Sequence, residues 1–266
     1  MRLIIDNLSF NYGSIKALEG VTFEVQDSEI IGIIGPNGSG KSTLLKCINR
    51  ILKPKQGYIL FNDLEINSMK RIEIAKIFGY VPQEGDMNYD DLTVFEIVLM
   101  GRRPYIRWWC EEEDLEKVWQ ILSLLNIENL AMRKINEISG GERQKVLIAR
   151  ALAQEAKILL LDEPTSNLDI KHQLEVMNLI RKLTKEKNIA TIIALHDLNL
   201  ASMYCDKLIM MKEGKIFAAG KPDYVLTVHN IEEVYGIKVI IERRSNRPYI
   251  VLLEDLNKEV INLVSY

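Results

Sequence analysis

The chain has 266 residues, of which 47% are hydrophobic and 27% charged, with a formal net charge of −3. A chain of this length and composition can bury a full hydrophobic core, which excludes a mainly disordered protein. Its charges are spread along the sequence rather than gathered into a basic stripe, so we expect no nucleic-acid partner.

The first third of the chain has the pattern of short strands. Segments rich in β-branched and aromatic residues are separated by Gly, Asp and Asn, which is typical of strands joined by turns. We predict strands at residues 2–10, 21–26, 29–35 and 57–62.

The middle of the chain changes to helical patterns. Thr93 and Glu96 form a capping box that predicts a helix start, and Gly101 is a typical stop. A second helix is predicted from the acidic run at 111–114, since acidic residues are favoured at a helix N-terminus. Its predicted apolar stripe consists of Leu115, Val118, Trp119, Leu122 and Leu125.

After Ser139 the chain alternates between helices and apolar runs. Helices are predicted from Ser139 to about Gln154 and over residues 170–187. Three continuous apolar runs without alternation are typical of strands buried on both faces of a parallel sheet. They lie at residues 157–164, 189–196 and 207–214.

These patterns predict an α/β fold with a mainly parallel sheet, an N-terminal antiparallel β subdomain and an inserted helical subdomain. We divide the chain into an α/β core with the β subdomain (1–82 and 155–219), the helical subdomain (83–154) and a C-terminal extension (220–266). The extension is expected to hold a β-hairpin and a short final helix over 256–266.

The sequence carries no signal for disulfides or for a membrane span. Cys47, Cys110 and Cys205 lie far apart and form no Cys-x-x-Cys or Cys/His cluster, so we expect packing residues in a reducing compartment. No apolar run approaches the ~18 residues that a spanning helix needs. We therefore expect a soluble, cytoplasmic protein that reaches any membrane through a partner.

The stretch "GPNGSGKST" at 35–43 fits the pattern GxxxxGK[ST], between an apolar strand and a helical segment as the motif requires. In such a loop the backbone N–H groups wrap phosphates, Lys41 brings positive charge to their oxygens, and the Ser42 hydroxyl ligates Mg²⁺. A glycine-rich turn without a ligand is the plainer alternative, and the flanking elements favour nucleotide binding. The residues expected at the phosphates are Gly35, Pro36, Asn37, Gly38, Ser39, Gly40, Lys41, Ser42 and Thr43.

Two adjacent carboxylates end the apolar run at 157–164. Asp162 is placed to hold the Mg²⁺ shell, and Glu163 is free to orient or deprotonate an attacking water. An isolated Asp-Glu pair would usually be a solvated turn. The phosphate loop upstream favours a hydrolytic site.

A second candidate anion site lies in "ISGGE" at 138–142. Ser139 offers a hydroxyl, and Gly140 and Gly141 leave backbone N–H groups accessible at a predicted helix start. An ordinary capped helix is the alternative. Since the phosphate loop already serves one nucleotide, the question is whose phosphate this second site binds.

Together these motifs resemble the ATP-binding subunits of ABC transporters, over nearly the whole chain and in the expected order. Within that family residues 138–142 correspond to the signature motif, which usually begins with Leu where this chain has Ile138. The resemblance implies ATP and Mg²⁺ as cofactors and a head-to-tail homodimer that closes on ATP and opens after hydrolysis. The residues that would cap the γ-phosphate bound to the opposite chain are Ser139, Gly140, Gly141 and Glu142.

The resemblance also assigns roles to single residues. Tyr12 matches the aromatic residue that stacks on adenine, and Gln83 matches the glutamine that contacts Mg²⁺ and the water. Asp169 matches the loop that crosses the dimer interface, and His196 matches the histidine that contacts the γ-phosphate. The other two histidines match no motif and are predicted to be structural, namely His172 and His229.

Residues 92–109 resemble importers of iron-siderophore complexes, haem and cobalamin, as do 166–183 and 234–253. The resemblance implies polytopic permease subunits that dock after Gln83, an extracytoplasmic binding protein beyond them, and a place on the inner face of the cell membrane. Trp108 and Trp109 depart from the importer pattern and are either core or a partner surface. The substrate would touch other subunits, so no residue here identifies it, and molybdate also stays open.

Three alternatives remain at this stage. A soluble ABC ATPase of DNA repair or translation usually carries two nucleotide domains or a long coiled coil, and this sequence has neither. An exporter subunit is less favoured because of residues 92–109. A protein that binds ATP without hydrolysing it would have no need of Glu163.

Overall fold

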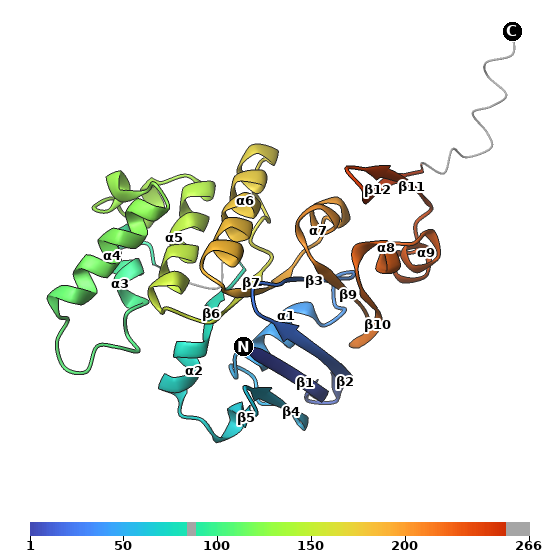
Figure 1. Cartoon of the computed structure of the whole chain (residues 1–266), viewed down its shortest axis with the longest axis horizontal. Coiled ribbons are helices and arrows are strands. Elements are labelled where there is room, and N and C mark those ends of the chain that lie inside the picture. Colours follow the sequence, from blue (N-terminus) through green and yellow to red (C-terminus); the bar gives the residue numbers. More distant parts are fainter. Residues whose placement is uncertain (84–88, 254–266) are drawn as a thin grey trace, which may run out of the picture.

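The central sheet organises the molecule (Figure 1). The computed structural model describes residues 1–83 and 89–253. The six strands of this sheet have the order β10-β9-β3-β8-β7-β6, and all neighbours pair in parallel except β9 and β10. The apolar runs are confirmed as strands: every residue of β7 and β8 is buried, as are the four central residues of β9, and β3, predicted at 29–35, is also buried throughout. The bounds are β3 (Ile30–Ile34), β6 (Phe78–Val81), β7 (Ile158–Asp162), β8 (Ala190–Ala194), β9 (Lys207–Lys212) and β10 (Lys215–Gly220).

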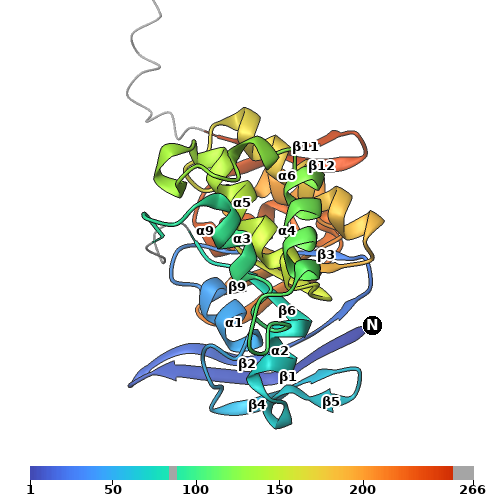
Figure 2. The same cartoon turned by 90° about the vertical axis from the view of Figure 1, so that its left-hand side faces the viewer.

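An antiparallel sheet of order β2-β1-β4-β5 forms a separate layer below the central sheet in both views (Figures 1 and 2). Its strands are β1 (Arg2–Tyr12), β2 (Ile15–Gln26), β4 (Gln56–Phe61) and β5 (Leu64–Glu65). β2 begins at Ile15, earlier than the predicted 21–26. The sequence pattern missed this first part, because register shifts against β1 interrupt the alternation by which a strand is recognised. The helix α1 (Lys41–Ile48) packs between the two sheets, with Leu44 and Leu45 in one buried cluster with Leu3 and Ile31.

The described α-helices between β6 and β7 form a layer beside the central sheet (Figures 1 and 2). They are α3 (Val94–Met100), α4 (Glu112–Leu124) and α5 (Gly140–Ala153). The capping box of Thr93 and Glu96 and the stop at Gly101 are confirmed.

The predicted apolar stripe of α4 was partly wrong. Val118, Leu122 and Leu125 are buried, whereas Leu115 is 37% and Trp119 42% exposed. The helix packs on its neighbours through a narrow face that includes Ile121, so Trp119 lies at the edge of the contact, against Phe95 with ring centroids 5.2 Å apart.

The remaining elements follow the core. The predicted hairpin is confirmed as β11 and β12, and Asn199 fixes it to α7 by hydrogen bonds to the backbone of Ile250 at 2.7 and 3.1 Å. The predicted final helix over 256–266 lies outside the described residues. The bounds are α2 (Arg71–Ile77), α6 (Ile170–Glu186), α7 (Leu198–Tyr204), α8 (Pro222–Val225), α9 (Val228–Tyr235), β11 (Val239–Arg244) and β12 (Arg247–Leu252), with 3-10 turns at Ile66–Ser68, Glu128–Leu130 and Ile135–Glu137.

The cysteines are free, as predicted, but only two of them pack in the core. Cys47 and Cys205 are buried and Cys110 is exposed, because it lies in the loop just before α4 and outside its packed face. Among the described residues we find no helix that is both long and apolar enough to span a bilayer.

Candidate functional site

The phosphate loop connects β3 to α1 at the carboxyl end of the parallel sheet. Gly40 has a φ of +103°, and a Cβ there would lie 2.6 Å from the carbonyl oxygen of Ala17 in β2. A Cβ at Gly35, where φ is +152°, would lie 2.4 Å from the carbonyl oxygen of Met211. Only glycine fits these positions, so the sequence enforces a tight loop at the start of α1.

The loop holds its two buried polar side chains in different ways. Lys41 is 5% exposed, and its Nζ donates hydrogen bonds to the carbonyl oxygens of Gly35 at 2.9 Å and Pro36 at 3.2 Å. Burial lowers the pKa of Lys41. The hydroxyl of Ser39 is buried and makes no hydrogen bond within the described part of the chain. A buried hydroxyl without a partner in a ring of backbone N–H groups fits a loop that binds an anion.

Ser42 and Asp162 meet at the end of β7. The Ser42 hydroxyl donates to Asp162 Oδ1 at 2.8 Å, and the Tyr80 hydroxyl donates to Oδ2 at 3.3 Å. Burial raises the pKa of Asp162, whose side chain lies almost wholly out of solvent. A carboxylate beside a hydroxyl is a donor set that suits Mg²⁺, which usually takes its remaining ligands from substrate phosphates and water. The residues present therefore fit that ion.

Glu163 is held by side chains from two neighbouring strand ends. Gln83, after β6, donates to Glu163 Oε2 at 2.8 Å, and Nε2 of His196, after β8, lies 2.5 Å from Glu163 Oε1. Glu163 has a φ of +52°. A non-glycine residue in this region costs on the order of 1–3 kcal/mol and persists only where its surroundings fix it. We call Gln83, Asp162, Glu163 and His196 the Glu163 cluster.

The predicted anion site at 138–142 has its own capping box. Glu142 Oε2 accepts from the backbone N–H and the hydroxyl of Ser139, at 2.9 and 2.8 Å, and Ser139 Oγ accepts from Glu142 N at 3.3 Å. The Ser139 hydroxyl therefore donates to the carboxylate three residues later, and its role at a phosphate stays a prediction. The N–H groups of Gly140 and Gly141 precede the first intrahelical bond of α5. Of these two glycines, Gly140 is exposed and Gly141 is buried.

Tyr12 and Asp169 lie at the ends of other elements. Tyr12 ends β1, is 48% exposed and packs edge-on against Phe10 with ring centroids 4.9 Å apart. Asp169 is the N-cap of α6 and accepts from the backbone N–H of His172 at 2.8 Å. Pro36, Asn37 and Thr43 lie in the phosphate loop and the first turn of α1, as predicted.

The sequence profile of the ABC transporter family matches residues 18–166, which contain the phosphate loop, Gln83, the segment at 138–142 and both carboxylates. The chain belongs to this family. It is an ATP-binding, ATP-hydrolysing subunit.

Two relatives show how far the similarity of this ABC ATPase extends. An uncharacterised ABC transporter ATP-binding protein of Methanocaldococcus jannaschii is 51% identical over 94% of the chain and 98% of the relative. The petrobactin import ATP-binding protein FpuC of Bacillus anthracis is 41% identical over 87% of the chain and 86% of the relative.

Solved structures agree with the fold. A transporter assigned to the metal-chelate type, in an inward-facing conformation, superposes with a TM-score of 0.82 at 30% identity, covering 94% of this chain and 96% of that one. A dimeric ATP-binding cassette in a post-hydrolysis state, bound to ADP and Pi, superposes with a TM-score of 0.72 at 31% identity, covering 82% and 98%.

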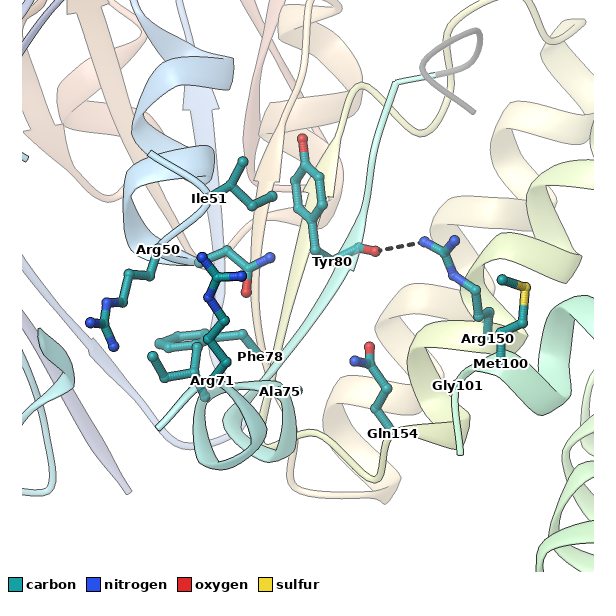
Figure 3. Close-up of a pocket in the computed structure, with 12 residues that line it drawn as sticks. Arg50, Ile51, Arg71, Ala75, Phe78, Tyr80, Met100, Gly101, Arg150 and Gln154 are labelled. Atoms are coloured by element: carbon teal, nitrogen blue, oxygen red, sulfur yellow. Dashed lines mark hydrogen bonds between the residues drawn. The ribbon is translucent and has the colours of Figure 1, made fainter. Parts of the chain in front are cut away.

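A groove of about 550 Å³ in this ABC ATPase lies between the segment after α1, α2 and the edge strand β6 on one side and the ends of α3 and α5 on the other (Figure 3). Tyr80 connects it to the Glu163 cluster, because the Tyr80 hydroxyl bonds Asp162 while its carbonyl oxygen accepts from Arg150 Nη2 at 3.2 Å. Sequence reasoning missed this groove, since its walls come from distant segments; only the position of Tyr80 just before Gln83 hinted at it. The lining includes Arg50, Arg71, Ala75, Phe78, Met100 and Gln154.

The tryptophan pair lies on the surface. Trp108 is 87% and Trp109 82% exposed. Both follow Gly101, which lines the groove, in the loop between α3 and α4. The structure therefore excludes the core alternative for these two side chains.

Proposed function

We propose that this subunit powers the import of a metal chelate, such as an iron-siderophore complex, haem or a cobalamin-like compound, through a membrane permease. The observation that carries the ATPase part is Glu163, held between Gln83 and His196 beside the Ser42–Asp162 pair. The import part is supported by the petrobactin import relative and by the superposition on a metal-chelate type transporter.

The chemistry assigned to each residue follows from its contacts. Lys41 and the N–H groups of the phosphate loop bind the phosphates, and Ser39 gains a partner there. Ser42 and Asp162 hold Mg²⁺, which supplies charge stabilisation at the phosphate oxygens when bound. Glu163 accepts a proton from, or orients, the attacking water. Gln83 and His196 fix the Glu163 carboxylate, and His196 would also contact a terminal phosphate.

The signature segment (residues 138–142) completes the site of a second copy. The N–H groups of Gly140 and Gly141, which precede the first intrahelical bond of α5, suit a terminal phosphate at a helix N-terminus. Two copies facing each other around a two-fold axis would each complete the other's site. Tyr12, exposed at the end of β1, is free to stack on the adenine.

ATP binding shifts the dimer toward its closed state, because the phosphate contacts the signature segment only in that state. Hydrolysis removes those contacts, and the dimer opens. The groove between the sheet and the helical layer is where we expect the permease to dock, because Tyr80 joins that groove to Asp162. The permease would hold the subunit at the inner face of the membrane and connect it to an external binding protein.

We keep the proposed division of the chain into core (1–82 and 155–219), helical subdomain (83–154) and C-terminal extension (220–266). The permease then contacts the boundary between the first two parts. A tilt of the helical layer would change the groove and the position of the signature segment together, since α5 carries Ser139 at one end and Arg150 near the other.

The first experiment measures the solution mass of Glu163→Gln with ATP and Mg²⁺. We expect a monomer to become a dimer, and Lys41→Ala to abolish the change by removing phosphate binding. A chain that binds ATP but stays monomeric at high concentration, also with its permease present, would contradict the shared site.

The second experiment tests transport. Ala75→Arg fills the groove, and Gln120→Arg places the same charge on an exposed position of α4 as a control. In proteoliposomes we expect a polytopic permease to stimulate hydrolysis by the wild type and the control but not by Ala75→Arg. Uptake of an iron-siderophore complex, haem or cobalamin then identifies the substrate. Active dimers that respond to no membrane partner would favour a soluble ABC ATPase instead.

A further inference from the structure

His172 matches no motif, yet it lies between two parts of the proposed shared site. It is in the first turn of α6, directly after Asp169, and its side chain is 35% exposed. Its neighbours are the signature segment on α5 and the loop that leads from Glu163 to Asp169, which we call the 163–169 loop.

The ring of His172 fills the space beside Gly141. A Cβ added at Gly141 would lie 2.5 Å from Cδ2 and 2.9 Å from Cγ of His172, closer than such atoms approach in proteins. The same atom at Gly140 would lie 3.6 Å from Leu168 Cδ2, an ordinary contact. The space available at Gly141, rather than at Gly140, is therefore limited by the His172 ring. Nearby, the Lys145–Glu175 ion pair at 3.1 Å holds α5 and α6 together.

The other side of the ring contacts Asp169. His172 Nδ1 lies 2.7 Å from Asp169 Oδ1, and the backbone N–H of His172 donates to the same oxygen at 2.8 Å. That backbone hydrogen bond lowers the pKa of Asp169, so the carboxylate is ionised and only accepts. Nδ1 of His172 is then the protonated ring nitrogen, and Asp169 fixes the orientation of the ring.

The 163–169 loop is tied at both ends. The backbone N–H and hydroxyl of Ser166 donate to the carbonyl oxygen of Glu163 at 3.1 and 2.8 Å. At the other end, Gln173 Nε2 donates to the carbonyl oxygens of Leu168 at 3.1 Å and Thr165 at 3.3 Å. A shift of Asp169 is therefore transmitted toward Glu163 rather than absorbed by a loose loop.

We propose that His172 is a positioning residue that links Glu163 of one ATP site to the glycines that the same chain presents to the opposite site. The inference rests on the proposed two-chain site. Gly141 is buried against the ring, whereas Gly140 is exposed, so the partner's nucleotide meets Gly140 and the resulting shift of the start of α5 changes the space open to the ring. The ring then moves Asp169 and the loop behind Glu163. Each chain would thus couple the two sites through the contact of one ring with one glycine.

A double-mutant cycle tests the contact with Gly141. ATP-driven dimerisation is measured by analytical ultracentrifugation for Glu163→Gln alone and with Gly141→Ala, His172→Ala or both. We expect Gly141→Ala to weaken dimerisation by about tenfold or more, and the added His172→Ala to recover at least about fivefold, because neighbours in contact are not additive. If the loss of dimer affinity in the double variant equals the product of the losses in the two single variants, the proposed link between His172 and Gly141 is wrong.

A second experiment distinguishes the effect of the His172 ring from that of its hydrogen bond to Asp169. It uses the chain with Glu163 intact. His172→Phe keeps the ring but loses the bond to Asp169, so we expect dimerisation within about twofold of wild type and a kcat lowered about fivefold. His172→Asn keeps a donor toward Asp169 but loses the ring, so we expect weaker dimerisation with a kcat near wild type at saturation. ATP binding to the monomer should not change in either variant.

Two results would contradict the proposal in different ways. If both variants lower only the temperature of thermal unfolding and keep wild-type kcat and dimerisation, His172 merely supports α6 and the link is wrong. If Glu163→Gln binds ATP yet never dimerises, the shared site itself is wrong, and the link with it.

Discussion

The two candidate phosphate-binding regions of this chain are built in opposite ways. The phosphate loop and the Glu163 cluster are joined across the ends of four strands; Lys41 and Asp162 are buried, and Ser42, Gln83 and His196 are already on their carboxylate partners. The signature segment is a helix start with its own capping box, in which Gly140 is exposed and Gly141 is buried. The first region is organised within one chain, whereas we propose that the second binds a phosphate held by another chain. The contacts of the signature segment with a phosphate would therefore stabilise the dimer rather than the single chain.

The sharpest way to test the first region is Glu163→Gln. We expect ATP hydrolysis to fall by about 10²–10⁴-fold, because the amide cannot accept the proton, while ATP binding is kept. A phosphate-release assay measures the change, with the exposed Glu186→Gln as the matched control. Hydrolysis within about twofold of wild type would remove Glu163 from the mechanism.

Mixing two inactive chains tests whether the second region serves another copy. Ser139→Arg blocks the signature segment and Lys41→Ala disables the phosphate loop, so we expect each alone to lose about 10²-fold in hydrolysis. In an equal mixture about half of the dimers are mixed, and each has one intact site, so up to about a quarter of wild-type activity should return. A mixture as inactive as its components would show that the two regions do not complement each other between chains.

Tyr12→Ala should weaken ATP binding by about two- to tenfold, the range expected for the loss of one aromatic stack. Tyr12→Phe keeps the ring and should bind like the wild type. Titration of a fluorescent ATP analogue against each monomer measures both. An equal loss in the two variants would mean that the hydroxyl, rather than stacking, carries the effect.

Asp162→Asn should stabilise the nucleotide-free chain by about 1 kcal/mol while it abolishes Mg²⁺-dependent hydrolysis, because the fold no longer buries a charge. Burial raises the pKa of Asp162 above its ordinary 3.8, so the folded chain binds a proton more readily than the unfolded one. The gain from Asn is then largest at neutral pH and shrinks as pH falls toward 3.8. Urea unfolding at two pH values checks it, and a gain independent of pH would contradict this explanation.

The smallest effect is expected at the tryptophan pair. Trp108→Ser and Trp109→Ser should change the free energy of unfolding by less than about 0.5 kcal/mol, because both side chains are exposed. The buried Val118→Ser is the contrasting control and should destabilise by several times as much. A large loss of stability at either tryptophan would show that it packs in solution.

The sequence was most informative where one element contains its own signal. The buried strands follow from apolar runs, the starts of α3 and α5 from capping boxes, and the phosphate loop from glycines that no other residue could replace. These signals arise from hydrogen bonds and steric limits between residues close together in the chain. Local chemistry therefore determined the element types, the order of the motifs and, with the resemblance to ABC ATPases, the family.

Only the tertiary structure decided how distant segments meet. It placed Gln83 and His196 on opposite oxygens of Glu163, opened the groove beside Tyr80 and set His172 against Gly141. It also exposed Trp119 and Cys110, which sequence patterns had assigned to packed positions, because burial depends on which neighbour covers a face rather than on the residue alone. A pattern along one segment records that segment's own periodicity, whereas a contact between two segments depends on how both pack against the rest of the core.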